Sequence, residues 1–440
     1  MNATVQAATR VIIDTDVGGD DMTAMLLAMA ALPAVMEVVL LTAVWGNVNV
    51  EKGLKNIISM FHILSLEMDW RKKQGLPLGF EAFRSFKPLV SLGSGHALGK
   101  PVVIEKDGFR EFSIPKYLLC WKKSNLTYML QDGPDGLQNF YKLHPDLAPD
   151  DSWKSLFEDD VPSPKERPEY FNYFNASRLP AHKEIIRVLK ENPPNTITVF
   201  ALGPMTNIAL AAAEDPEALL RMKELLVMGG AIDSPGNMSP VAEFNTFYDP
   251  VACARSFALS SRDPASTMPP ANYCKIPLGP YPEKLSKQLT VKLFPLDITL
   301  TNCVDYDRFS KSIKPKLDAG SPLVTLVNTY LTGLYKKNTS DPCVVLHDPL
   351  PMWYALTENN TAWNLSSPRD IRVETEGQWT YGMDVVDRRG EKRANGVNET
   401  EVDDDTLGWL SAVRGNRIIQ AMESPGADAF YERVMKLLGL

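Results

Sequence analysis

The sequence lacks the features that mark several large classes of protein. Its five cysteines are widely spaced and include no C-x-x-C pair, which argues against a cysteine-based zinc site and predicts reduced thiols. It has no polybasic run, and 54 acidic residues outnumber 46 basic ones, so nucleic acid is not an expected partner. The first ten residues contain no apolar segment typical of a signal peptide, which predicts a cytoplasmic protein.

Two features bear on membrane insertion and secretion. Met22 to Trp45 is almost uncharged and long enough to span a bilayer, but Pro33 and Glu37 interrupt it. We therefore interpret this segment as a helix, a turn and a strand, and expect no membrane partner. Secretion, which would make the N-x-S/T triplets glycosylation sites, is the less favoured alternative because the first residues show no signal peptide. Such triplets begin at Asn125, Asn338 and Asn398, among others.

Short apolar runs alternate with helix-forming segments along the chain. Strands are predicted near residues 11–13, 37–44, 196–202 and 225–228, and helices near 22–32 and 206–213. This alternation predicts an α/β fold with a doubly wound, mainly parallel sheet flanked by helices, whose ligand site lies at the carboxyl ends of the strands. We expect a single domain over residues 1–440, with insertions near 69–178 and 260–282 and a polar loop near 387–405.

Four aspartates crowd the loop after the first predicted strand, in the segment DTDVGGDD at residues 14–21. Like charges a few Å apart disfavour joint ionisation, and a divalent cation removes that penalty. Gly18 and Gly19 are expected to let the loop turn tightly enough for the side chains to converge. An oxygen-rich cluster without cysteine or neighbouring histidine predicts Ca²⁺ or Mg²⁺. The alternative is that Asp20 and Asp21 only cap the following helix in a solvated loop.

A second polar segment follows the strand predicted near residues 225–228. Glycine and asparagine at 229–237 permit a loop that wraps around a ligand. Glu243 and Asn245, two residues apart, are expected to project to one side of an extended segment, where carboxylate and carboxamide suit sugar hydroxyls. An ordinary Asx-turn loop is the alternative reading of Asn237.

His347 and Asp348 form a third candidate, between the apolar pair Val344-Val345 and a helix-forming segment. The chain has only five histidines, so one beside an aspartate at a strand end is notable. An isolated His-Asp pair is more often a helix cap, and the functional interpretation depends on the other two clusters.

Together these segments resemble the inosine-uridine-preferring nucleoside hydrolase family, whose hallmark is an amino-terminal D-x-D-P-G-x-D-D motif. The likeness continues in the family's order along the core of the chain. The matching segments are DTDVGGDD at 14–21, WGNV at 45–48, GPMTNIA at 203–209, MGGA at 228–231, GNMSPVAEFNTFYDP at 236–250, PLDIT at 295–299 and HDP at 347–349.

The resemblance implies a role for each matched residue. It implies a calcium ion held by carboxylates and one backbone carbonyl, those of Asp16, Asp21, Asp348 and Thr206. It implies contacts to the ribose hydroxyls and the 5′-hydroxymethyl group from Asp20, Asn237, Glu243 and Asn245. Asn47 is similar to a residue near the ribose and the catalytic water, and Met228 to one that lines the sugar pocket.

The implied chemistry is hydrolysis of the N-glycosidic bond of a ribonucleoside. Calcium would bind the ribose hydroxyls, with Asp348 beside them, and Asp16 would deprotonate the water that calcium holds. His347 would protonate or contact the leaving base. Family members commonly form homodimers or homotetramers. Departures are Val17, where the family has proline, and Asp132-Gly133, where many members have His-Gly, which leaves the base preference open.

Two rival functions also fit parts of the sequence. Asp14, Asp16 and Val17 after an apolar strand resemble the haloacid-dehalogenase phosphatases, in which the first aspartate is the nucleophile and Mg²⁺ the cofactor. That reading leaves the GPMTN, AEFN and HDP segments unexplained. The other rival is a calcium- or nucleoside-binding protein on the same fold that has lost catalysis.

Overall fold

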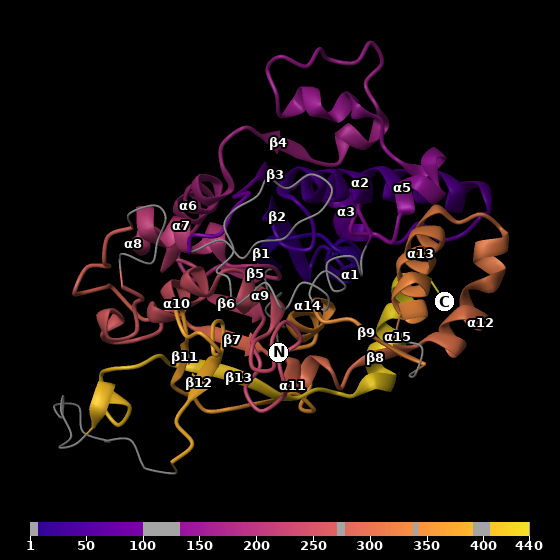
Figure 1. Cartoon of the computed structure of the whole chain (residues 1–440). Coiled ribbons are helices and arrows are strands. Elements are labelled where there is room, and N and C mark those ends of the chain that lie inside the picture. Colours follow the sequence, from indigo (N-terminus) through magenta and orange to yellow (C-terminus); the bar gives the residue numbers. More distant parts are fainter. Residues whose placement is uncertain (1–7, 100–132, 271–277, 338–341, 390–404, 440) are drawn as a thin grey trace, which may run out of the picture.

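A nine-stranded sheet forms the centre of the computed structural model, which describes residues 8–99, 133–270, 278–337, 342–389 and 405–439 (Figure 1). Its strand order is β10-β13-β7-β6-β5-β1-β2-β3-β4, and all neighbours are parallel except β10 and β13. The strands are β1 Thr9–Thr15, β2 Met36–Ala43, β3 Leu89–Leu92, β4 Asn175–Ser177, β5 Ile197–Ala201, β6 Glu224–Met228, β7 Val291–Phe294, β10 Asn364–Leu365 and β13 Ile418–Glu423. Two small antiparallel pairs are added, β8 Cys303–Asp305 with β9 Cys343–Val345 and β11 Ile371–Val373 with β12 Asp384–Val386.

Helices cover both faces of this sheet, as the predicted doubly wound fold requires (Figure 1). The α-helices are α1 Gly19–Met29, α2 Val50–Lys73, α3 Glu81–Ser85, α5 Phe140–Leu143, α6 Ala181–Glu191, α7 Thr206–Glu214, α8 Pro216–Leu219, α9 Phe244–Tyr248, α10 Pro250–Ala258, α11 Leu296–Thr299, α12 Tyr306–Asp318, α13 Pro322–Lys337, α14 Pro349–Leu356 and α15 Ala427–Leu437. Short 3-10 helices lie at Pro145–Leu147, Asp151–Leu156, Glu169–Asn172, Pro264–Ser266 and Thr406–Gly408.

Strand β1 shows why the chain forms a sheet buried on both faces. Val11 and Ile13 pack with α1, α2, α13 and α14 on one side, whereas Ile12 packs with α6, α7 and α10 on the other. All three side chains are fully buried, which stabilises the fold by about 1.5–3 kcal/mol for each. The order β5-β1-β2 makes β1 the switch point of the sheet, and the loop after β1 opens at its carboxyl edge.

The uncharged segment from Met22 to Trp45 is a helix, a turn and a strand, as predicted, and it is divided between α1 and β2. Within the described part of the chain, no helix is both long and apolar enough to cross a membrane.

The region near 69–178 was predicted as an insertion, and the structure corrects this in part. Its first residues complete the 24-residue helix α2, and it supplies β3 and β4 to the central sheet. Helix α2 was not among the predicted elements, although its apolar residues recur at helical spacing. Asn49 caps it by accepting from the Lys52 amide at 2.9 Å. Residues 100–132, including Asp132, and most of the polar loop near 387–405 lie outside the described residues.

Candidate active site

A cavity of about 420 Å³ lies at the carboxyl edge of the sheet, where β1, β5 and β6 end. Eight of the residues predicted from the sequence line it, although they come from four distant segments of the chain. They are Asp20, Asn47, Met228, Asn237, Glu243, Asn245, His347 and Asp348. Asp16, Asp21 and Thr206 do not line it and are fully buried.

Three carboxylates meet at the amino-terminal end of α1. Asp20, Asp21 and Asp348 each offer an oxygen within 4.8 Å of the others. Burial, and after it the charge of Asp20, raise the pKa of Asp21 to about 6 and that of Asp348 well above its usual value. Such a group resists full ionisation unless a cation lies among its oxygens. The arrangement therefore can bind a metal ion.

Asp16 lies beside this cluster, at the end of β1. Its Oδ2 accepts a hydrogen bond of 2.6 Å from the Asn47 amide, and Asn47 Nδ2 donates to Asp21 Oδ2 at 3.1 Å. Its other oxygen, Oδ1, is buried and has no partner among the described residues. Burial and the charge of Asp21 both raise the pKa of Asp16. An unpartnered buried carboxylate oxygen next to three carboxylates fits a hard cation.

Two glycines make room for the Asp16 carboxylate. A Cβ on Gly203 would stand 2.8 Å from Asp16 Oδ1, and a Cβ on Gly46 would collide with Asp16 Oδ2. Gly46 and Gly203 belong to the WGNV and GPMTNIA segments, and nothing in the sequence indicates that they make room for Asp16. Their role is visible only once both loops lie against β1.

The loop between β1 and α1 uses its glycines differently from our prediction. The left-handed backbone falls on Val17, whose φ is 28°, whereas Gly18 has an ordinary φ of −90°. Gly18 is needed for space, because a Cβ there would stand 2.8 Å from Asn47 Nδ2. The tight turn therefore strains Val17, and the glycine allows Asn47 to approach.

Asp14 and Thr206 are held by structural hydrogen bonds. Asp14 Oδ1 accepts from the Thr42 hydroxyl at 2.5 Å and from Asn207 Nδ2 at 2.7 Å, and burial raises its pKa to about 7. Thr206 begins α7 and its hydroxyl donates to Asp249 at 2.7 Å. Asn207 of GPMTN is thus a positioning residue that the sequence reading missed.

Glu243 and Asn245 do not lie on an extended segment, contrary to our prediction. Glu243 caps the short helix α9, because its carboxylate accepts from the amides of Asn245 at 2.8 Å and Thr246 at 3.0 Å. It also accepts from the Gly230 amide at 2.9 Å, which joins α9 to the loop after β6. Burial raises the pKa of Glu243 to about 7. Both residues still reach the cavity, one from the cap and one from the first turn.

The loop after β6 is fixed from several sides. Asn237 Oδ1 accepts from the Phe244 amide at 2.9 Å, and Asn245 Nδ2 donates to the Met228 carbonyl at 3.2 Å. Asp297, from the PLDIT segment, accepts from three consecutive backbone amides of this loop. These bonds hold the cavity wall in place without a ligand.

His347 also lines the cavity. Its amide donates to Asp20 Oδ2 at 3.1 Å, and its Nδ1 is 2.8 Å from the Thr299 hydroxyl. Burial lowers its pKa, an effect that the charge of Asp20 opposes. Nε2 has no hydrogen-bond partner among the described residues and is the ring atom left for a ligand. The pair follows a strand, as predicted, but this strand is β9, which pairs with β8 and lies outside the central sheet.

The cavity wall also includes apolar residues that were not predicted as site residues. Phe244 lies within the AEFN segment and stacks on Tyr248 with ring centroids 4.1 Å apart. Leu300 directly follows α11, and Leu334 belongs to α13. A planar apolar group fits against such surfaces, and only Phe244 could have been identified from the sequence.

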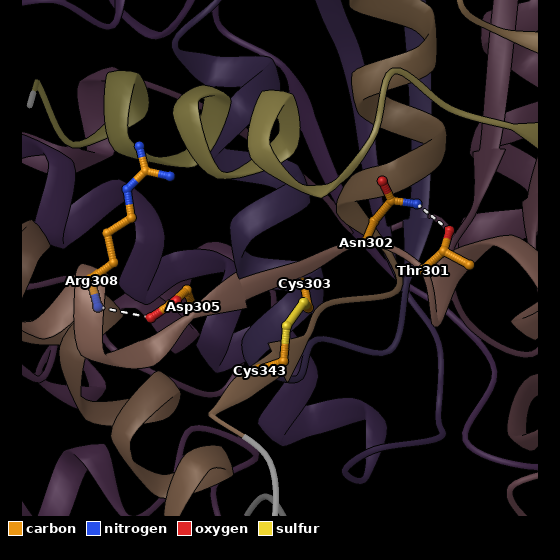
Figure 2. The surroundings of a disulfide bond; sticks show 6 residues. All are labelled: Thr301, Asn302, Cys303, Asp305, Arg308 and Cys343. Carbon is orange, nitrogen blue, oxygen red and sulfur yellow. Dashed lines mark hydrogen bonds between the residues drawn. A yellow bond between two sulfur atoms is a disulfide. The ribbon is translucent and has the colours of Figure 1, made fainter.

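A disulfide between Cys303 and Cys343 joins β8 to β9 (Figure 2). Our prediction that the cysteines are reduced is wrong for this pair, because the antiparallel pairing of β8 with β9 brings their Cα atoms within 5.6 Å. Cys343 also lines the cavity, four residues before His347. Cys253 is free and buried, and Cys120 and Cys274 lie outside the described residues.

Comparison with known proteins agrees with this site. The sequence model of the inosine-uridine preferring nucleoside hydrolase family matches residues 11–407. An uncharacterized protein of Schizosaccharomyces pombe is 30% identical over 225 residues, which are 50% of this chain and 62% of that protein. The non-specific ribonucleoside hydrolase RihC of Klebsiella pneumoniae is 24% identical, over 89% of this chain and 93% of its own.

Solved structures share the fold. A purine-preferring ribonucleoside hydrolase from Gardnerella vaginalis superposes with a TM-score of 0.60 at 20% identity, covering 98% of both chains. An inosine-guanosine nucleoside hydrolase gives 0.62 at 18% identity, over 98% of this chain and 99% of that one. The predicted fold and the predicted resemblance are both confirmed. The chain belongs to the inosine-uridine preferring nucleoside hydrolase family.

Proposed function

We propose that this protein hydrolyses the N-glycosidic bond of ribonucleosides, releasing ribose and the free base. The observation that carries the proposal is the cavity itself. Polar residues from four segments distant in sequence surround one space beside a cluster of carboxylates. Membership of the family supports an N-glycosidase activity.

The proposed cofactor is Ca²⁺, held by the carboxylates of Asp16, Asp21 and Asp348 and the backbone carbonyl of Thr206. The unpartnered Oδ1 of Asp16 and the closeness of Asp21 to Asp348 support this ligand set. All-oxygen ligands suit calcium better than zinc. When bound, calcium supplies a positive charge that orients ribose hydroxyls and lowers the pKa of water.

Residues of the chain are proposed to activate the water and to hold the ribose. Asp16 is the proposed proton acceptor for the attacking water, and Asn47 fixes its carboxylate through the 2.6 Å bond to Oδ2. Asp20, Asn237, Glu243 and Asn245 are proposed to hold the ribose hydroxyls, with Met228 against the sugar. Cleavage develops positive charge on the ribose ring, and the surrounding carboxylates favour that charge.

His347 is proposed to assist the leaving base. It lines the cavity, and its Nδ1 is hydrogen-bonded to the Thr299 hydroxyl, so the ring is oriented before substrate binds. Phe244 and Leu334 provide apolar surface of the kind that a planar base packs against. The oligomeric state and the cytoplasmic location stay predictions. The disulfide removes the cysteine argument for a cytoplasmic location, because disulfides persist mainly in oxidising compartments.

Neither rival function explains the cavity as well. A haloacid-dehalogenase phosphatase needs Asp14 as an accessible nucleophile, and Asp14 is fully buried and bonded to Thr42 and Asn207. A nucleoside-binding protein without catalysis would not need Asn47 to hold the Asp16 carboxylate. The other features of the cavity fit such a protein equally well.

Release of ribose from inosine and uridine, measured with and without a calcium chelator, tests the proposal. We expect ribose from at least one nucleoside, loss of activity with the chelator, and recovery on adding Ca²⁺. Nucleoside binding without ribose release would favour the binding protein. Activity that survives complete chelation would contradict the metal assignment.

A further inference from the structure

A second cavity, of about 300 Å³, lies at the other end of α1 and is lined by four cationic side chains. Arg71 comes from α2, Lys316 from α12, and Arg433 and Lys436 from α15. Cations from three helices converge on this space, and nothing in the proposed hydrolysis uses them.

Arg71 is the best-defined of these groups. Only 6% of the residue is exposed, and its Nε donates to Glu67 at 2.7 Å while Nη1 donates to the Leu78 carbonyl at 3.1 Å. Its Nη2 is buried and has no hydrogen-bond partner among the described residues. Since an unpaired buried donor is costly, a buried guanidinium nitrogen at a cavity wall indicates an acceptor supplied by a ligand.

Lys316 faces the same space. Its Nζ donates to the carbonyls of Leu438 at 2.8 Å and Gly439 at 2.7 Å. The position that a Cβ on Gly439 would take lies 2.8 Å from Lys316 Nζ and 3.8 Å from Arg71 Nη2, so the two cations flank one small volume. Burial and the charge of Arg71 lower the pKa of Lys316, an effect that the charge of Glu67 opposes.

The charge balance favours a dianion. Arg433 and Lys436 form no ion pair with any described residue, and burial lowers the pKa of Arg433. Glu81 lines the cavity and Glu67 pairs with Arg71, so among the described residues two carboxylates stand against four cations, an excess of two positive charges. A phosphate monoester carries about two negative charges at pH 7 and suits a guanidinium beside an ammonium.

We propose that this cavity binds a phosphate monoester carried on a small apolar body. The rest of its wall is apolar and includes Leu27, Leu76, Pro77 and Leu437, and the Phe80 ring lies 5.2 Å from the Arg71 guanidinium carbon. The phosphate would accept from Arg71 Nη2 and from Lys316, Arg433 and Lys436, while its substituent packs on the apolar wall. The inference is independent of the proposed hydrolysis.

Isothermal titration of the full chain tests the site, with phenyl phosphate and inorganic phosphate as probes and phenol as the uncharged control. We expect both anions to bind, phenyl phosphate more tightly, and phenol not to bind. Replacing Lys316→Gln, or Arg433→Gln with Lys436→Gln, should weaken binding by about tenfold or more through loss of charge-assisted hydrogen bonds. Lys311→Gln, an exposed change on the same helix, should bind as the wild type does.

These variants spare the buried Arg71–Glu67 pair, so we expect them to fold, and their circular dichroism melting checks this. Higher salt should also weaken binding, because the site is electrostatic. The proposal is overturned if the wild type binds neither anion up to about 10 mM, which corresponds to less than roughly 3 kcal/mol of binding free energy. It is equally overturned if folded Lys316→Gln and Arg433→Gln/Lys436→Gln proteins bind phenyl phosphate as tightly as Lys311→Gln.

Discussion

Helix α1 has a cavity at each end, and the two cavities carry opposite charge. Asp20, in its first turn, lines the cavity of carboxylates, whereas Leu27 and Ala30, at its end, line the cavity of arginine and lysine. The 11-residue helix is about 16 Å long. Near each end of the helix a buried charged group has an unpartnered atom, Asp16 Oδ1 at the acidic end and Arg71 Nη2 at the basic end.

The two ends of α1 fit ligands of opposite charge. At the acidic end the crowded carboxylates fit a hard cation, and at the basic end the converging cations fit a dianion. Only the acidic end corresponds to motifs of the family. The basic end shows that a charged site can be assembled from residues that form no motif at all.

Asp16→Asn is the substitution expected to have the largest effect. It keeps the shape of the side chain but removes the proposed proton acceptor, so turnover should fall by about a hundred- to ten-thousand-fold with little change in KM. Steady-state kinetics on inosine and uridine measure both constants. An unchanged turnover would remove Asp16 from the role of base.

His347→Ala should have the next largest effect. Loss of assistance to the leaving base should slow hydrolysis of natural nucleosides by about a hundredfold. A riboside with a good leaving group, such as p-nitrophenol, needs little assistance and should be cleaved at nearly the normal rate. Equal losses on both substrates would argue against general acid catalysis by His347.

Gly203→Ala tests the space around Asp16 and should have a smaller effect. The new methyl group would stand 2.8 Å from Asp16 Oδ1 and displace the carboxylate by a few tenths of an Å, which should cost about tenfold in kcat/KM. Gly53→Ala is the matched control, since the nearest atom to its Cβ lies 3.8 Å away and alanine favours the helix α2. Equal activity of the two variants would show that Gly203 does not position Asp16.

The sequence predicted those parts of the molecule whose physical cause is local. Apolar runs at Val11–Ile13 and in β2, β5 and β6 identified the central strands, and the crowded aspartates after β1 identified the carboxyl edge where the cavity lies. The HDP segment was found from the sequence, but Val344 and Val345 alone do not reveal that their strand pairs with β8 outside the central sheet.

Features that depend on contacts between distant segments could not be predicted. The Glu243 carboxylate caps α9 and also accepts a hydrogen bond from the Gly230 amide of the loop after β6. The pairing of Cys303 with Cys343 depends on β8 lying against β9. The basic cavity needs α2, α12 and α15 side by side, and none of its cations lies in a pattern that sequence alone distinguishes from solvated charge.

Direct titration of Ca²⁺ tests most sharply whether the acidic end of α1 is a cation site. The metal-stripped wild type should bind one Ca²⁺ per chain, and Asp21→Asn should weaken that binding by at least about tenfold through loss of a ligand charge. Glu243→Gln, at the same cavity but outside the carboxylate cluster, should bind Ca²⁺ as the wild type does. Absence of Ca²⁺ binding by the wild type, or equal binding by Asp21→Asn, would contradict the account.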